Sequence, residues 1–379
     1  MCPPGSLLLG TAAGLRAPEG EVIGGGRLDL AADEALDLPM PERDQDARPA
    51  SAEAGPRPRV AAGPRPQVTV IGEALIDLVP GGEPRSFLAL PGGSPYNVAI
   101  GLARLGNDTT LMARLAGSAF GRMLRERAAA EGIQLDAAPH ASEPATLAVV
   151  SLDASAQASY DFYVEGTADW QWTAEETSRT PENTAVLHFG SIASWTPPGD
   201  EHIRGLASRM RDRGDVLVSY DANIRPRLLA DRGHGRELVE RCVRLAHLAK
   251  ASAEDIGWLY PGQCTDDVAR QWLGLGATVV VITNGASGAD AFTGDGPAVH
   301  RPARKVTVVD TVGAGDSLTA GLLASFVRRG LHSPRQLAGS QPPQLAAALD
   351  DAILVAAFTC QRAGNDPPTL AEFESGLPQ

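Results

Sequence analysis

The sequence of 379 residues is poor in several kinds of residue, and each scarcity argues against a class of protein. Lys and Arg total 33 against 46 Asp and Glu, and the resulting net charge of −13 argues against a nucleic-acid-binding protein, which needs clustered cations. No run approaches the roughly 20 apolar residues of a membrane span, and no signal-peptide pattern is present, so we expect a cytoplasmic protein without a membrane partner. The four cysteines are scattered and form no metal-binding pattern, which argues against a disulfide framework: Cys2, Cys242, Cys264 and Cys360.

Aromatic residues are missing from the first part of the chain, where the first one is Phe87. Residues 1–66 instead hold 10 prolines and 9 glycines, with runs such as Gly24-Gly25-Gly26 that break helices and strands. Such a segment has little surface to bury. We therefore predict a disordered or low-complexity extension over 1–66, followed by one folded domain over 67–379.

Three familiar nucleotide-binding patterns are also lacking. There is no G-x-x-x-x-G-K-[ST] loop, no G-x-G-x-x-G after the first expected strand, and no protein-kinase residue set. A P-loop kinase, a dinucleotide-dependent enzyme and a protein kinase are therefore disfavoured.

The folded part alternates strand-like and helix-like patterns. We expect strands at 68–79, 109–115, 185–190, 216–220 and 278–282, and helices at 97–105, 120–131, 201–212, 236–246, 316–329 and 344–361. This alternation predicts an α/β fold with a mostly parallel sheet covered by helices on both faces. Segments near 84–90 and 145–164 do not fit the alternation, and we expect them to form a small separate sheet over one edge.

The sharpest motif is Asp-Thr-Val-Gly-Ala-Gly-Asp-Ser at 310–317, between a β-like run at 306–309 and a helix. Glycines before a helix allow backbone N–H groups to converge, and the helix N-terminus favours an anion there. Asp316 is either a helix N-cap or a general base beside a phosphate site, and the motif alone does not separate the two.

Four further motifs carry polar residues at expected turns. Gly92-Gly93 precedes a helix that holds Asn97, and Arg225 follows a predicted strand, where ligands bind in open α/β sheets. Residues 250–255 supply carboxylates that could position Mg²⁺, although a helix cap at Ser252 explains them locally. Residues 283–288 form a Gly-containing turn after the 278–282 strand.

Together, these motifs resemble the ribokinase-like sugar kinases, the phosphofructokinase-B type family. DTVGAGDS at 310–317 is similar to its carboxyl-terminal signature and PGGSPYNVAIGLARLG at 91–106 to its amino-terminal one. Five stretches are most similar to bacterial fructokinases: GEALIDLVP (72–80), YDFYVEGTADW (160–170), SYDANIRPRLL (219–229), EDIGWLYPG (254–262) and CQRAGNDPP (360–368). The resemblance implies a three-layer α/β/α ribokinase-like sandwich with a small β-sheet lid. It also implies ATP-dependent phosphorylation of a sugar hydroxyl, with fructose as the first candidate.

The resemblance also implies roles for individual residues. Asp316 matches the catalytic base, Gly313, Ala314 and Gly315 the anion hole, and Arg225 a phosphate-facing arginine. Asp77, Gly92, Gly93 and Asn97 match sugar contacts. The ATP-binding positions are Lys250, Ser252, Thr283, Gly285 and Gly288. Asp310 matches a position near a monovalent-cation site, so K⁺ joins ATP and Mg²⁺ among the expected cofactors.

One departure concerns the metal. The family's Asn-x-x-Glu motif is here Ser252-Ala-Glu-Asp255, with a shorter carboxylate, so Mg²⁺ is assigned to Asp255 or to the neighbouring Glu254.

Substrate identity transfers less safely than the reaction, because 2-keto-3-deoxygluconate kinases, ribokinases and nucleoside kinases share these signatures. The absence of a basic residue between 153 and 176 favours a neutral sugar. A non-catalytic sugar-binding regulator is the alternative outside catalysis, and a homodimer through the lid is the expected assembly.

Overall fold

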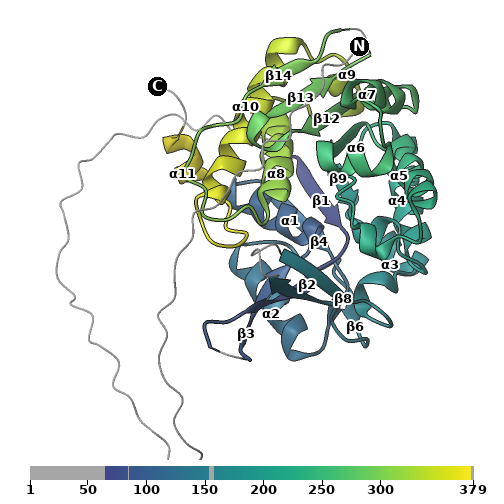
Figure 1. Cartoon of the computed structure of the whole chain (residues 1–379). Helices are drawn as coiled ribbons and strands as arrows, with labels where there is room; N and C mark the ends of the chain where they lie inside the picture. Colours follow the sequence, from purple (N-terminus) through teal and green to yellow (C-terminus); the bar gives the residue numbers. More distant parts are fainter. Residues whose placement is uncertain (1–64, 84, 153–157, 295, 377–379) are drawn as a thin grey trace, which may run out of the picture. The chain divides into compact units, whose positions relative to one another are not determined.

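A computed structural model describes residues 65–83, 85–152, 158–294 and 296–376 (Figure 1). Residues 1–64 of the expected extension lie outside the described residues. The same holds for residue 84 and residues 153–157 of the expected lid. All that follows concerns the domain that begins at residue 63.

The main sheet has eight strands in the order β14-β13-β12-β11-β10-β9-β1-β4. The six from β12 to β4 are parallel, and β13 and β14 are antiparallel at one edge. Their bounds are β1 Gln67–Ile71, β4 Asp108–Met112, β9 Thr184–Gly190, β10 Leu217–Asp221, β11 Leu248–Ser252, β12 Val279–Thr283, β13 Ala289–Phe292 and β14 Val299–Arg301.

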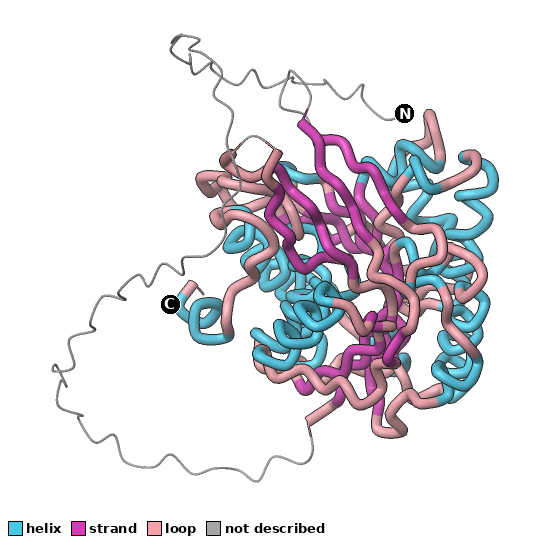
Figure 2. The backbone as a smooth tube through the Cα atoms, turned by 90° about the horizontal axis from the view of Figure 1, so that it is seen from below, coloured by secondary structure: helices cyan, strands magenta, loops and turns pink. Residues whose placement is uncertain are grey.

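Helices cover both faces of this sheet (Figure 2). One layer contains α1 Ser94–Arg104, α2 Ala119–Ala130, α8 Ala314–Arg328, α9 Pro334–Ala338, α10 Pro342–Cys360 and α11 Leu370–Ser375. The other contains α3 Ala174–Ser178, α4 Asp200–Arg213, α5 Arg232–Leu245, α6 Ala253–Leu259 and α7 Thr265–Gly274. Strand β1 serves both cores, because Val68 and Val70 pack in the first and Ile71 in the second. The three-layer sandwich expected from the sequence is confirmed.

A second sheet of four strands, in the order β3-β2-β7-β8, forms the lid. Its strands are β2 Leu75–Pro80, β3 Phe87–Gly92, β7 Leu147–Leu152 and β8 Ala158–Tyr163. The remaining elements are short: β5 Leu115–Ala116, β6 His140–Ala141, and the 3₁₀ turns η1 Ala168–Trp170, η2 Ile192–Ser194, η3 Pro226–Leu228 and η4 Gly285–Ser287.

Several sequence predictions are corrected by the structure. The single strand expected at 68–79 is two strands in different sheets, β1 and β2, so the lid contains one strand more than predicted. The β-like run at 306–309 is not a strand, and its Val308 and Val309 are exposed. The strand expected at 109–115 ends at Met112. Strand β11, which holds Lys250, was not predicted.

Helix α10 is long and apolar enough to cross a membrane by length and composition alone, which the sequence analysis did not anticipate. It packs against α8, and residues such as Leu349, Ala352 and Val355 lie in the core. Its apolar character therefore has a structural explanation within the fold.

Candidate active site

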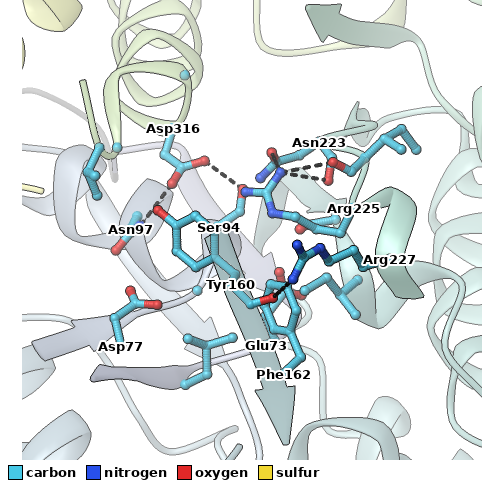
Figure 3. Close-up of a pocket in the computed structure, with 18 of the residues that line it drawn as sticks. Glu73, Asp77, Ser94, Asn97, Tyr160, Phe162, Asn223, Arg225, Arg227 and Asp316 are labelled. Carbon is cyan, nitrogen blue, oxygen red and sulfur yellow. Dashed lines mark hydrogen bonds between the residues drawn. The ribbon is translucent and has the colours of Figure 1, made fainter. Parts of the chain in front are cut away.

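The main cavity lies beyond the carboxyl ends of β1 and β9. Strand β4, which follows β1 in the parallel part of the sheet, lies on one side of the β1–β9 pair, and the strands that follow β9 lie on the other side. The strand order therefore reverses between β1 and β9, and ligands of open α/β sheets bind in the crevice at such a point. The cavity has a volume of about 680 Å³. Lid residues Leu75, Asp77, Tyr160 and Phe162 line it, together with core residues that include Glu73, Gly93, Ser94, Asn97, Ser191, Asn223, Arg225, Arg227, Glu254, Gly313, Gly315 and Asp316 (Figure 3).

Asp316 lies in the first turn of α8 and points into this cavity. The Ser94 hydroxyl donates a hydrogen bond of 2.7 Å to its Oδ1, and Asn97 Nδ2 donates one of 2.8 Å to its Oδ2. Burial raises the pKa of Asp316, although both hydrogen bonds oppose that shift. The carboxylate is not the N-cap of its helix, a position that Gly313 occupies. It is thus an oriented, desolvated carboxylate.

The turn before Asp316 leaves part of the helix N-terminus open to the cavity. Gly313 and Gly315 line the cavity, whereas the Ala314 N–H donates to the Thr311 carbonyl at 3.2 Å. The turn is entered from a loop rather than from the expected strand. The partial positive charge of the α8 N-terminus nevertheless faces the site, as an anion hole requires.

Asp77 lies on β2, in the lid, and faces the same cavity. Burial raises its pKa to about 6, while Arg225 opposes the shift and Asp316 adds to it. Gly92 on β3 does not line the cavity but lies behind this carboxylate. A Cβ at Gly92 would come within 2.1 Å of Asp77 Oδ2.

The opposite wall carries two arginines from the segment after β10. Arg225 Nη1 donates to Asn223 Oδ1 at 2.7 Å, which fixes one end of the guanidinium at the cavity. Arg227 Nη1 donates to the Tyr160 carbonyl of lid strand β8 at 3.0 Å. The segment therefore presents a cation to the site and also contacts the lid.

A second cavity of about 300 Å³ adjoins the first. Asn223, Ile224, Arg225, Pro226, Glu254 and Gly315 line both cavities. The second also has Asp221, Lys250, Ser252, Asp255, Trp258 and Thr283 on its wall. The site is therefore divided into two compartments, with Asp316 on the side of the larger one and Lys250 on the side of the smaller one.

Not every predicted residue lies at these cavities. Gly285 and Gly288 line neither. The Asp310 carboxylate accepts hydrogen bonds from the N–H groups of Val312 and Gly364 and so organises its loop. Both oxygens of Asp255 accept hydrogen bonds, Oδ1 from the Ile224 N–H and Oδ2 from the N–H and hydroxyl of Ser252, in a capping box. Both Asp255 oxygens are therefore engaged within the protein, whereas Glu254 lines both cavities.

Other residues of the site were missed from the sequence. Ser94 looked like part of a turn, and Glu73 and Tyr160 appeared only inside longer similar stretches. Asp221 ends β10 directly before the Asn223–Arg225 segment, so its position at a strand's carboxyl end was the available signal. Burial raises the pKa of Glu73 to about 7, a shift that needs the structure to be seen.

Comparison with known proteins assigns the architecture to a family. Residues 65–371 match the model of the pfkB family of carbohydrate kinases. The chain belongs to this family. The kinase is 37% identical over 271 residues to the fructokinase of Rhizobium leguminosarum bv. trifolii, a match that covers 70% of this chain and 82% of the relative.

Two solved structures extend the comparison of the kinase. The fructokinase of Xylella fastidiosa with bound ATP aligns with a TM-score of 0.75 at 27% identity, over 82% of this chain and 97% of that one. The aminoimidazole riboside kinase of Salmonella enterica, complexed with aminoimidazole riboside and an ATP analogue, aligns with a TM-score of 0.70 at 28% identity, over 82% and 99%. The resemblance expected from the two signatures is confirmed, and the protein is a sugar kinase.

Proposed function

We propose that this kinase transfers the terminal phosphoryl group of ATP to a hydroxyl of fructose. The observation that carries the proposal is the orientation of Asp316 by Ser94 and Asn97 in the larger compartment, directly after Gly315, which lines both compartments. The sugar occupies the larger compartment under the lid, and ATP the smaller one. The names of the similar fructokinases support fructose as the sugar.

The reaction follows from this arrangement. Asp316 accepts the proton of the attacking hydroxyl, and the hydroxyl oxygen forms a bond to the terminal phosphorus. The bond from that phosphorus to the bridging oxygen breaks, and ADP leaves with the electron pair. Because little covalent chemistry falls to the protein in phosphoryl transfer, positioning and charge stabilisation dominate. The α8 N-terminus and Arg225 supply positive charge, and the raised pKa of Asp316 strengthens it as a base.

A divalent cation fits this site through few protein ligands. No cluster of three or more His, Cys, Asp or Glu suited to a metal occurs among the described residues. Mg²⁺ commonly binds through one or two carboxylates, the phosphates of the substrate and water. We propose that Glu254, which lines both cavities, holds Mg²⁺ with the ATP phosphates. When bound, Mg²⁺ neutralises phosphate charge.

A nucleoside is the second candidate substrate. Tyr160 and Phe162 lie on the lid and line the larger cavity. Their rings are stacked, with centroids 6.1 Å apart. Aromatic rings there could pack against a base as well as against a sugar. The similarity to the aminoimidazole riboside kinase keeps this candidate open to test.

Two further expectations stay part of the proposal. On lid strand β3, the side chains of Leu88 and Leu90 are 58% and 40% exposed, and a second copy of the lid would cover them in a homodimer.

An enzyme that uses ATP and a neutral sugar is proposed to act in the cytoplasm.

A substrate panel with coupled ADP detection tests the proposal. Fructose, ribose, 2-keto-3-deoxygluconate and aminoimidazole riboside are compared at equal concentration with ATP and Mg²⁺. We expect fructose to give the highest kcat/KM. A clear preference for the riboside would move the assignment to a nucleoside kinase. Binding of fructose without any ADP release would contradict catalysis and favour a sugar-binding regulator.

A further inference from the structure

The outer strand of the lid is held by a side chain of the core. In the described part of the chain, β8 ends the lid sheet, and such an edge strand presents carbonyl groups that no neighbouring strand binds. Arg227 Nη1 donates a hydrogen bond of 3.0 Å to the Tyr160 carbonyl of β8, and the same nitrogen is 3.4 Å from Asp161 Oδ1 (Figure 3). Arg227 belongs to η3, which follows β10 of the main sheet. The arginine therefore contacts the lid both on its backbone and on a carboxylate.

The turn that carries Arg227 is fixed to the core. The Ile224 N–H donates a hydrogen bond of 2.9 Å to Asp255 Oδ1, at the start of α6. Pro226 stands between the two arginines of the turn and restricts the backbone there. Arg225 and Pro226 line both cavities, and Arg227 lines the larger one. A short, stiff piece of backbone thus connects the boundary between the two compartments with the edge of the lid.

The contact determines where Tyr160 lies. Side chains alternate along a strand, so Tyr160 and Phe162 share the face of β8 that lines the larger cavity, whereas Asp161 lies on the other face. Burial raises the pKa of Tyr160, Asp77 raises it further and Arg225 lowers it, so the phenol lies near groups on both walls of the cavity. The Tyr160 side chain therefore covers the compartment assigned to the sugar. A displacement of the β8 edge would displace it.

Stability of the fold does not explain the contact. Arg227 and Asp161 are 61% and 65% exposed, and ion pairs with such exposure contribute little to the stability of a domain. The hydrogen bond to the carbonyl is the stronger part, because its donor is a cation. A small free energy nevertheless shifts an equilibrium between two positions of a lid, since such positions differ by only a few kcal/mol. The contact is suited to bias the lid rather than to hold the domain together.

We propose that Arg227 is a positioning residue that holds the β8 edge of the lid closed, so that Tyr160 stays over the sugar and water stays out of the site of transfer. The proposal rests on the proposed function, because the sugar lies beneath the lid and ATP lies beside it. Arg227 acts through the backbone of Tyr160. In an open site, water takes the place of the sugar hydroxyl. Its oxygen bonds to the terminal phosphorus, the bond to the bridging oxygen breaks with its electron pair on ADP, and the proton passes to solvent.

Steady-state kinetics test the role of the arginine. Arg227→Met removes the donors and keeps an unbranched side chain. We expect the sugar KM to rise about three- to tenfold, because a smaller closed fraction lowers the apparent affinity in proportion, while the KM for ATP stays within about twofold. The phosphate released per sugar phosphorylated should rise about threefold or more. Arg227→Lys keeps a cation with donors and should recover part of both effects. If neither quantity changes in Arg227→Met, the proposal is wrong.

A matched control and a double variant follow the effect to its source. Arg179→Met breaks another exposed ion pair, with Glu175 in α3, whose side chains are 55% and 79% exposed and line neither cavity. It should leave both KM values and the released phosphate within about twofold. Tyr160→Ala removes the ring that the arginine positions, so a further Arg227→Met substitution should change the sugar KM by less than about twofold. An equal rise in both backgrounds would refute a role through Tyr160.

Hydrogen–deuterium exchange separates this proposal from the proposed function, because it needs no turnover. In the full-length chain without ligands, the amides of β8 should exchange about threefold faster or more in Arg227→Met than in the wild type and in Arg179→Met. If this holds while the wild type phosphorylates no sugar, the proposed function fails and the contact with the lid stands. If the wild type phosphorylates fructose, but β8 exchange and the sugar KM are unchanged in Arg227→Met, the proposed function stands and the role of Arg227 is refuted.

Discussion

Asn97 Nδ2 donates a hydrogen bond of 2.8 Å to Asp316 Oδ2 across a separation of 219 residues in the sequence. The bond joins the first helix after the lid strand β3 to the first turn of α8. Each residue belongs to one of the two sequence signatures, so their contact explains why the signatures occur together. The carboxylate is held by two donors that leave it facing the cavity, which favours a base over a purely structural aspartate.

The first prediction concerns this base. Asp316→Asn keeps the size and the cavity position of the side chain but cannot accept the hydroxyl proton. We expect kcat to fall by about 10²–10⁴-fold, the usual contribution of a positioned general base, with little change in the affinity for ATP. Coupled ADP detection measures kcat, and isothermal titration measures the affinity. Turnover close to that of the wild type would rule out Asp316 as the base.

The second prediction concerns the pH dependence of sugar binding. Burial raises the pKa of Asp77 to about 6, so the carboxylate is ionised above that pH and protonated below it. The ionised form is the stronger acceptor for sugar hydroxyls, so the affinity for the sugar should fall as the pH drops through 6. Titration in the Asp316→Asn background separates this effect from titration of the base. Asp77→Asn should bind the sugar roughly 10–100-fold more weakly and show no change between pH 5 and 7. If the sugar affinity of Asp77→Asn changed with pH as much as that of the protein with Asp77, Asp77 could not be the source of the pH dependence.

The third prediction concerns the buried carboxyl of Glu73. Burial raises its pKa to about 7 from 4.5, so between these values the folded protein keeps a proton that the unfolded chain has lost. The folded state then binds more protons, and stability falls as the pH rises through this window. Glu73→Gln carries no charge at any pH and should lose this dependence. Between pH 5.5 and 8, the free energy of unfolding of the wild type should drop relative to the variant by on the order of 1–2 kcal/mol.

Asp169 must be considered in that experiment. It is fully buried next to Ala74, its pKa is raised to about 6, and its effect on stability has the same sign. It is present in both proteins, so the difference between wild type and variant reports Glu73 together with its repulsion by Asp169. Denaturant titrations at several pH values provide the measurement, and parallel curves for the two proteins would contradict the prediction.

The sequence predicts the layers of the fold better than the points where the chain changes direction between sheets. Apolar strands such as β12 and the alternation with helices were recognisable because parallel strands are buried on both faces. The run at 68–79 looked like one strand, yet the chain turns into the lid at Gly72. There φ is +156°, and a Cβ would come within 2.4 Å of the Pro95 ring. This change of direction depends on the contact between Gly72 and Pro95, which are distant in the sequence, so no local pattern predicts it.

Two further differences have a similar cause. The β-branched run at 306–309 finds no neighbouring strand and stays a loop, because β-propensity reflects packing more than backbone preference. Strand β11 was hidden by Lys250 and Ser252, which are polar because they face the cavity. The glycine and carboxylate motifs of the site were visible in the sequence. Ser94 and Asp221 are held by hydrogen bonds to distant side chains, and Glu73 by one from the Ala193 N–H, so their places in the site needed the fold.

The fourth prediction uses the close approach of Gly92 to Asp77. A methyl group at Gly92 would come within 2.1 Å of Asp77 Oδ2 and 3.0 Å of its Cγ, so the carboxylate has to move away from its position at the sugar compartment. We expect Gly92→Ala to raise the sugar KM at least tenfold while the KM for ATP stays within about twofold, because the smaller cavity is not touched. Gly82→Ala is the matched control, since a Cβ there meets nothing within 4 Å, and it should leave both constants unchanged. Equal rises in both KM values for Gly92→Ala would indicate a general disturbance of the lid, and an unchanged sugar KM would mean that the position of Asp77 does not determine sugar binding.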